Sequence, residues 1–265
     1  MKTGMKVFLF GLLFLTSALS PASAQENVSW LQKIKMFFTG NSEAEQVQAA
    51  EKQEKKTETP VPEKKKPVFD FSEKAIGNRE APLKINVFTS LTCPHCTNAH
   101  TQLLPYLKEK YVATNEAIII LNDFPIDPRA MTASLISRCL SGDAYYAFIE
   151  TLFENQRSWA VANDVQEAIL PYAKLAGLNE EDMIACATDS SAMKEIIRQR
   201  NLAIMRYNIH ATPTFVLQLG KEKEIFEGAP GRADIDERIE KLKKTYTGTW
   251  PSAQEKTERP EPAAP

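Results

Sequence analysis

The hydrophobic period of the chain changes twice between residues 68 and 246, and no other feature constrains the fold as strongly. Residues 83–89 alternate as a strand does, and residues 117–121 form a continuous apolar run typical of a strand buried on both faces. A helix that begins near Pro94 separates the two. Its apolar stripe consists of Leu103, Leu104, Leu107 and Tyr111. The pattern predicts a strand–helix–strand unit.

Residues 129–207 have helical periodicity throughout. Breaks between these helices are expected at Gly142, Pro171 and Gly177. A strand pattern resumes at residues 214–217 and, more weakly, at residues 224–227. An amphipathic helix over residues 234–244 follows. The sequence therefore predicts a small α/β sheet that is interrupted by a block of helices.

The composition is that of a globular protein. The 265 residues are 43% hydrophobic and 25% charged, which suffices for one substantial core. The formal net charge of −2 gives no electrostatic reason to expect nucleic acid as a partner.

Residues 1–24 have the pattern of a secretory signal peptide. Lys2 and Lys6 precede an apolar run, and the small residues Ala22-Ser23-Ala24 follow as a cleavage site. An uncleaved membrane anchor is the alternative, but the run is shorter than the ~20 residues that span a bilayer. We therefore expect an exported protein, in the periplasm or outside the cell, where disulfides persist.

The core is flanked by segments of different composition. Residues 25–40 form a short amphipathic segment, which is expected to be an oligomerisation helix, a membrane-surface helix or an arm packed on the main domain. Residues 41–67 are rich in Glu, Gln, Lys and Pro, and are predicted to be a solvated linker. Residues 247–265 are predicted to be a disordered tail.

The tetrapeptide CPHC at residues 93–96 carries the predicted chemistry. Cys93 precedes Pro94 at the expected helix start, where unpaired backbone N–H groups and the helix dipole stabilise a thiolate. Cys93 is therefore the expected nucleophile. His95, when protonated, adds positive charge near this sulfur and favours the reduced pair over the disulfide, as in an oxidant. Cys96 is expected to attack Cys93 and so resolve a mixed disulfide.

Three other roles for this cysteine pair have to be weighed. A zinc site needs a second pair of ligands, and neither the other cysteines nor His100 and His210 form an evident cluster. A c-type haem needs histidine directly after the second cysteine, where Thr97 stands. A structural bridge normally closes a longer loop. The sequence thus favours a redox pair, without metal or bound cofactor.

Cys139 and Cys186 remain as an even pair within the predicted helices. In an exported protein such a pair most simply forms a structural disulfide, and two buried free thiols or a redox role are the alternatives. We expect His100 and His210 to be surface or packing residues, with a place near the active-site disulfide as the alternative for His210.

The order strand, CPHC, helix, strand, helices and then Thr-Pro before a strand resembles the DsbA family of periplasmic thiol oxidoreductases. The resemblance covers about residues 68–246 and includes LFENQ at residues 152–156 and ATPTF at residues 211–215. The family's thioredoxin fold carries a helical domain in its middle. The resemblance also implies that the Thr212-Pro213 bond is cis and that Thr212 offers backbone groups to an extended substrate chain.

This resemblance predicts an α/β protein whose all-helical domain is inserted between the βαβ and ββα halves of a thioredoxin fold. The thioredoxin-like domain would comprise residues 68–128 and 208–246, and the inserted domain residues 129–207. The implied activity is the introduction of disulfides into reduced exported proteins, with reoxidation by a membrane quinone reductase of DsbB type.

Other functions stay open at this stage. A DsbC-like or ScsC-like isomerase or reductase would use residues 25–40 to form a homo-oligomer. A periplasmic copper or zinc carrier would bind metal through the two thiols and His95. A chaperone without redox chemistry would not need Cys93.

Val87 departs from the family's pattern. Many thioredoxin-fold enzymes have a buried acid six residues before the first cysteine, where it helps to move protons at the second thiol. Asn86, beside this position, cannot replace an acid. We therefore expect proton transfer from Cys96 to rely on water.

Overall fold

The computed structural model describes residues 66–251. In this part of the chain a five-stranded sheet has the strand order β1-β3-β2-β4-β5. Strands β2 and β3 are parallel, and the other neighbouring strands are antiparallel. The strands are β1 (Lys74–Ile76), β2 (Leu83–Thr89), β3 (Ala117–Asp123), β4 (Thr214–Leu219) and β5 (Glu222–Glu227).

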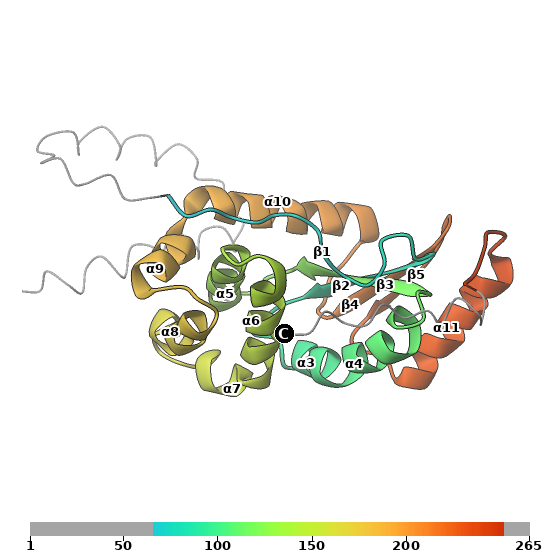
Figure 1. The fold of residues 1–265 in the computed structure, drawn as a ribbon, viewed down its shortest axis with the longest axis horizontal. Helices are drawn as coiled ribbons and strands as arrows, with labels where there is room; N and C mark the ends of the chain where they lie inside the picture. Colours follow the sequence, from blue (N-terminus) through green and yellow to red (C-terminus); the bar gives the residue numbers. More distant parts are fainter. Residues whose placement is uncertain (1–65, 252–265) are drawn as a thin grey trace, which may run out of the picture. The chain divides into compact units, whose positions relative to one another are not determined.

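Helices connect these strands and cover both faces of the sheet (Figure 1). One helical segment joins β2 to β3 and comprises α3 (Pro94–Asn98), η1 (Ala99–Leu103), α4 (Leu104–Leu107) and η2 (Lys108–Val112). Between β3 and β4 lie α5 (Pro128–Arg138), α6 (Gly142–Glu154), α7 (Gln156–Trp159), α8 (Val165–Leu175), α9 (Glu180–Thr188) and α10 (Ser190–Tyr207). Helix α11 (Arg232–Thr245) follows β5. The helices thus interrupt the sheet where the sequence predicted.

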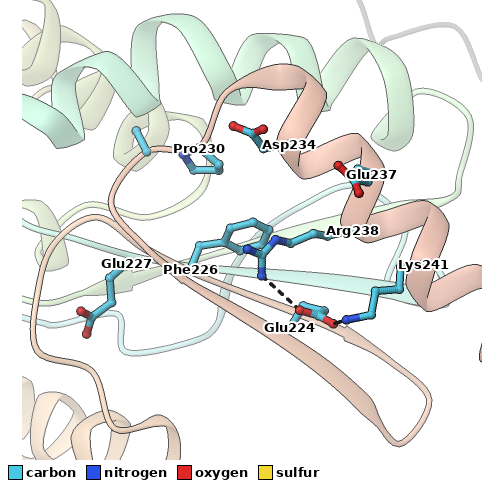
Figure 2. Close-up of a pocket in the computed structure, with 9 residues that line it drawn as sticks. Glu224, Phe226, Glu227, Pro230, Asp234, Glu237, Arg238 and Lys241 are labelled. Carbon is cyan, nitrogen blue, oxygen red and sulfur yellow. Dashed lines mark hydrogen bonds and ion pairs between the residues drawn. The ribbon is translucent and has the colours of Figure 1, made fainter.

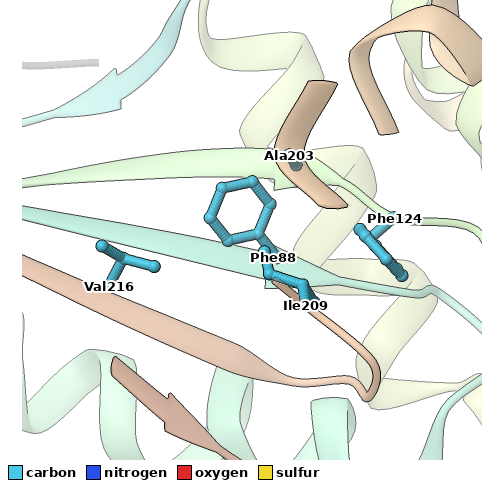
Figure 3. Close-up of a cluster of buried hydrophobic side chains, with 5 residues drawn as sticks. All are labelled: Phe88, Phe124, Ala203, Ile209 and Val216. Carbon is cyan, nitrogen blue, oxygen red and sulfur yellow. The ribbon is translucent and has the colours of Figure 1, made fainter. Parts of the chain in front are cut away.

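An apolar cluster fills the space between the sheet and α10 (Figure 3). Phe88 of β2 and Val216 of β4 meet Ala203 of α10, and Phe124 and Ile209 complete the cluster. The rings of Phe88 and Phe124 meet edge to face with their centres 6.5 Å apart, an arrangement that aromatic quadrupoles favour. The cluster fixes the carboxyl end of β2, from which the CPHC loop departs.

The opposite face packs against the β2–β3 helical segment and α11 (Figure 1). The predicted apolar stripe of this segment is buried, as expected. The segment contains two π-helical turns, η1 and η2. Pro105 has no N–H to bond the carbonyl of Thr101, and the wider turn η1 precedes it directly. A local proline thus explains the first departure from a regular α-helix.

A polar cluster ties α11 to this helical segment. Asp236 accepts hydrogen bonds from Tyr106 and, at 2.7 Å, from Tyr111. Lys110 forms an ion pair of 2.6 Å with the same carboxylate. The predicted last helix is confirmed, and its buried side chains are Ile235, Ile239 and Leu242.

Two of the three predicted breaks in the helical block are confirmed. Gly142 opens α6 with φ +56°, and Gly177 follows α8 with φ +94°, a region that glycine enters without strain. The break predicted at Pro171 is wrong, because Pro171 lies inside α8. Proline leaves the carbonyl of Glu167 without its helical bond, but both residues are exposed and water can satisfy that group.

Strand β1 was not predicted from the sequence. It has three residues, too few for a period to show. Its Lys74 is buried, pairs with Asp70 at 2.6 Å and lies over the ring of Tyr145. The contacts that make this strand, with β3 and with Tyr145, are distant in the sequence.

The predicted signal peptide and the amphipathic segment 25–40 lie outside the described residues. The linker 41–67 and the tail 247–265 lie mostly outside them, so all four stay predictions. Within residues 66–251, no helix has the length and apolarity needed to cross a membrane.

Candidate active site

The CPHC motif begins the helix that follows β2. Cys93 is extended, with φ −79° and ψ 121°, and Pro94 occupies the first helical turn. Proline suits this position because its missing N–H would have no helical partner there. The carbonyl of Cys93 accepts the N–H groups of Cys96 and Thr97 at 3.0 and 3.2 Å. The sulfur of Cys93 therefore lies at the start of the helix, where the sequence predicted it.

The thiol of Cys93 is strongly acidified. A hydrogen bond from the Cys96 thiol is the main reason that the pKa of Cys93 is lowered to about 5. Burial opposes this effect, and Thr212 and the backbone N–H groups of Cys96 and His95 support it. Hydrogen bonds to a thiolate favour the charged form, so Cys93 is ionised at neutral pH.

The environment of Cys96 shifts its pKa in the opposite direction. It is fully buried, and burial followed by the hydrogen bond to Cys93 raises its pKa above the ordinary thiol range. The backbone N–H of Ser90 points at its sulfur from 3.4 Å. Both cysteines are free thiols, so the structure describes the reduced pair. At neutral pH the sulfur of Cys93 is therefore a thiolate, the form that attacks a disulfide, whereas the sulfur of Cys96 is protonated.

The sulfur of Cys93 in the reduced protein is expected to titrate near pH 5, as measured by the ultraviolet absorbance of the thiolate. The pKa of Cys93 in the folded protein is below that of an ordinary thiol, so the thiolate adds to the free energy of unfolding. This contribution is complete above the ordinary thiol pKa. It is lost as the pH falls through about 5. Thr212→Val keeps the shape but removes the hydroxyl, and should raise the midpoint. An unchanged midpoint would contradict the role of Thr212.

A second loop meets the CPHC motif from the other end of the domain. The Thr212-Pro213 peptide bond is cis, and the carbonyl oxygen of Thr212 lies 3.3 Å from Cys93 Sγ, from which it accepts a hydrogen bond when Cys93 is protonated. The carbonyl of Pro213 accepts the N–H of Gly228 at 2.7 Å. Residues 119 positions apart thus share one site.

His95 is exposed, and its backbone N–H is the part that stabilises the Cys93 thiolate. The sequence analysis assigned the tuning to the charge of the imidazole, whereas the structure attributes it first to the Cys96 thiol. A charge effect of His95 stays a prediction. The imidazole borders a cleft of about 450 Å³ next to the site. The other residues of this cleft are Asn98, Gln102, Leu103, Gly228, Ala229, Pro230, Gly231 and Arg232.

A second cleft of about 500 Å³ lies between β5 and α11 (Figure 2). It shares Ala229 and Pro230 with the first cleft but contains no residue of the CPHC motif. Glu224 bridges Arg238 and Lys241 at 3.2 and 2.6 Å across it. This cleft is therefore remote from the thiol chemistry.

Two side chains, one in the helical insertion and one just before it, hold the active-site loop, and neither was predicted to have a role. Gln156 donates from Nε2 to the carbonyls of Leu91 and Cys93 at 2.8 and 3.0 Å. Asp127 accepts the hydroxyl of Thr92 at 2.5 Å and also caps α5. The LFENQ fragment contains Gln156, so the family resemblance held a signal for it. Asp127 had no such signal.

Replacing Gln156 by leucine is expected to destabilise the protein by about 1–3 kcal/mol, because the carbonyl of Leu91 loses its side-chain donor and that of Cys93 keeps only its two helical N–H donors. The loop that carries Cys93 should loosen, and exchange should slow. Denaturant unfolding and the rate of reaction with a disulfide reagent check both effects. Gln166→Leu, on α8, is the matched control and should change neither. Wild-type stability and rate in Gln156→Leu would contradict the role of the amide.

The other predicted residues form no hydrogen bond with either active-site thiol in the described part of the chain. Cys139 and Cys186 form a disulfide. His210 is exposed. His100 is a packing residue, stacked on Phe153 with the ring centres 3.9 Å apart. Among residues 66–251, no group of three or more His, Cys, Asp or Glu side chains is arranged to hold a metal ion.

Comparisons with known proteins agree with this architecture. The family described as thioredoxin matches residues 71–241. A putative protein-disulfide oxidoreductase of Rickettsia bellii is 27% identical over 177 residues, which cover 66% of this chain and 68% of that protein. A protein of the same name from Rickettsia prowazekii is 25% identical over 193 residues, covering 72% and 71%.

Solved structures of DsbA proteins resemble this chain in fold. The structure of α-DsbA1 from Wolbachia pipientis superposes with a TM-score of 0.59 at 28% identity, covering 69% of this chain and 92% of that one. DsbA from Chlamydia trachomatis shares the fold, with a TM-score of 0.55 at 20% identity over 70% of this chain and 98% of that one. The predicted fold and the predicted resemblance are thereby confirmed. The chain belongs to the thioredoxin family, and within it to the proteins that resemble DsbA.

Proposed function

We propose that the protein is a thiol:disulfide oxidoreductase that introduces disulfides into exported proteins through the Cys93–Cys96 pair. The observation that carries this proposal is the contrast between the two thiols. The pKa of Cys93 is lowered to about 5, whereas that of Cys96 is raised by burial. The curated relatives are named as putative protein-disulfide oxidoreductases, which supports the reaction class.

The direction of the reaction follows from thiolate stability. A thiolate that is stabilised in the folded protein favours the reduced pair over the disulfide. With a pKa lowered from 9.0 to about 5, this preference is on the order of 2 kcal/mol at neutral pH, after allowance for solvent screening. An enzyme whose reduced form is favoured gives its disulfide away. The protein should therefore act as an oxidant.

In the proposed cycle, a substrate thiolate attacks Cys93 of the oxidised pair. The Cys93–Cys96 bond breaks, a mixed disulfide forms with Cys93, and Cys96 leaves as a thiolate that takes up a proton. The second substrate thiol then attacks the mixed disulfide and releases reduced enzyme. In this cycle backbone groups of Thr212 hold the extended substrate, a role supported by the distance of 3.3 Å between its carbonyl oxygen and Cys93 Sγ.

The proposed compartment is the periplasm, and the proposed reoxidant is a membrane quinone reductase of DsbB type. The signal-peptide pattern of residues 1–24 supports export. The Cys139–Cys186 disulfide supports it independently, because structural disulfides persist in oxidising compartments. Reduced exported proteins are then the substrates.

The test measures three properties of the mature protein: oxidation of a reduced substrate, repair of a scrambled substrate, and metal binding. Oxidised protein should oxidise a reduced, unfolded disulfide protein faster than glutathione disulfide does, and its equilibrium with glutathione should favour the reduced enzyme. Repair of a scrambled substrate without net oxidation, or loss of an oligomer when residues 25–40 are deleted, would favour the isomerase alternative. Stoichiometric copper or zinc on the reduced protein would favour a carrier. A strongly reducing equilibrium would overturn the oxidase proposal.

A further inference from the structure

A small buried cavity lies at the carboxyl ends of β2 and β3. Its volume is about 10 Å³, which is room for a single water molecule. Thr89, Asn122 and Asp123 bring polar groups to its wall, and His100 closes it from the β2–β3 helical segment. The remaining lining residues are Leu91, Leu121, Tyr145, Ile149 and Phe153. A cavity with several polar neighbours suits water.

His100 has a buried nitrogen that its packing role does not explain. Its ring stacks on Phe153, yet Nε2 is buried without a hydrogen-bond partner among residues 66–251. Such an atom is costly unless water satisfies it. Burial, with a smaller effect of the Lys108 charge, lowers the pKa of His100 to about 3, so the ring is neutral at neutral pH. A neutral imidazole has one donor and one acceptor nitrogen.

The cavity is linked to Cys96 through the β2 loop and through the helical segment. The N–H of Ser90 points at the Cys96 sulfur, and Thr89 and Leu91, on either side of Ser90, both line the cavity. Cys96 and His100 are four residues apart in one helical segment, a spacing that puts two side chains on the same side of a helix. The cavity and the buried thiol are therefore connected by two short stretches of chain.

The cavity also adjoins the position of the missing acid. Val87 lies two residues before Thr89 on β2, and so on the same face of the sheet. It pairs in register with Leu121, which lines the cavity. An apolar side chain thus occupies the usual place of the acid, and its register partner Leu121 lines the same cavity as His100.

We propose that a water molecule in this cavity and Nε2 of His100 form the proton path of Cys96, in place of the acid that Val87 replaces. Because His100 acts through water and not on the sulfur itself, it is a positioning residue. This inference rests on the exchange reaction proposed above.

The proton balance of the path is as follows for a Cys93–glutathione mixed disulfide. Cys96 Sγ attacks Cys93 Sγ, a Cys93–Cys96 bond forms, and glutathione leaves as a thiolate with the electron pair of the broken bond. The proton of Cys96 passes to the water and from the water to Nε2. The other ring nitrogen releases a proton toward solvent, so the imidazole changes tautomer and carries no lasting charge. The reverse sequence protonates Cys96 when it is the leaving group.

The charged groups around His100 are compatible with this path. Asp123 on β3 is paired with Arg138 on α5 at 2.6 Å, so the two charges compensate each other. Tyr145 on α6 is protonated at neutral pH, because burial raises its pKa. Lys108 on η2 disfavours an imidazolium. These groups keep the ring neutral, as a tautomeric relay requires.

The test separates the two steps of one reaction. Reduced protein is mixed with glutathione disulfide and quenched at intervals, and mass spectrometry follows the mixed disulfide. In His100→Phe, which keeps the ring stack on Phe153, attack by Cys93 should keep its rate. Resolution by Cys96 should slow by at least about tenfold, so that the mixed disulfide accumulates. In His100→Ala, added imidazole should restore resolution.

The controls distinguish the possible failures. His210→Phe, an exposed histidine, should behave as the wild type, and thermal unfolding of each variant reports on folding. Wild-type resolution in His100→Phe, or absence of imidazole rescue in folded His100→Ala, would overturn the proton path and leave the oxidoreductase proposal intact. A wild type that forms neither a mixed disulfide at Cys93 nor a Cys93–Cys96 disulfide would instead overturn the proposed function, and with it the inference built on it.

Discussion

Replacing Cys93 by alanine is expected to abolish disulfide exchange, with a loss of at least about a thousandfold. The reason is that no other thiol in the described structure is both ionised and placed at the site: Cys96 is buried and has a raised pKa, and the remaining two cysteines are bonded to each other. A thiol reacts as its thiolate, so Cys96 alone cannot substitute at neutral pH. The rate of oxidation of a reduced protein substrate measures the effect.

Cys96→Ala is the matched variant, because it removes the other half of the pair. Cys93 should still attack a disulfide, and the mixed disulfide should then persist, since no resolving thiol remains. The variant also removes the thiol hydrogen bond that is the main cause of the low Cys93 pKa, so the midpoint of the thiolate titration should rise. Function that survives Cys93→Ala would favour the chaperone alternative and contradict the redox reading.

Removing the Cys139–Cys186 disulfide by double alanine substitution is expected to lower the free energy of unfolding by about 4 kcal/mol. The bond joins residues 47 positions apart, and opening such a loop restores conformational entropy to the unfolded chain. For a domain of this size the melting temperature should fall by roughly 10 °C. Calorimetry of the oxidised protein under non-reducing conditions is the measurement.

The control for this prediction is the chemistry of the other pair. The Cys93 titration and the equilibrium with glutathione should stay unchanged in the double variant, because Cys139 and Cys186 lie in the helical insertion and contact neither active-site sulfur. A shifted glutathione equilibrium in a folded variant would show instead that the second pair takes part in electron transfer.

The parts of the fold that the sequence predicted are those with a local cause. The continuous apolar run at residues 117–121 identified a strand buried on both faces, and Pro94 marked the start of the helix that carries the thiols. Gly142 and Gly177 marked helix boundaries because their positive φ angles favour glycine. Each of these signals depends on one residue or one short run.

The parts that were missed depend on partners far along the chain. Lys74 is buried in β1 by a distant aromatic ring, and nothing in its own segment indicates a strand. Pro171 is tolerated inside α8 because the carbonyl of Glu167, which lacks its helical N–H donor, belongs to an exposed residue. That exposure depends on which side of α8 packs against the domain. The site follows the same division. The nucleophile was predictable from CPHC, but the hydrogen bond from the Cys96 thiol that lowers the pKa of Cys93 and the hydrogen bonds of Gln156 to its loop were not.

The two hydrogen bonds of Gln156 and the one of Asp127 have a consequence for protein engineering. The bonds of Gln156 make the insertion part of the reactive centre and not an appendage of the sheet, because this one side chain donates to the carbonyls of Leu91 and Cys93. Asp127, just before the insertion, holds the hydroxyl of Thr92. Grafting the tetrapeptide CPHC onto a bare thioredoxin scaffold would therefore transfer the thiols without their support. Conversely, a homologue that shortens these helices would have to find new donors for the same backbone groups before it could keep the same reactivity.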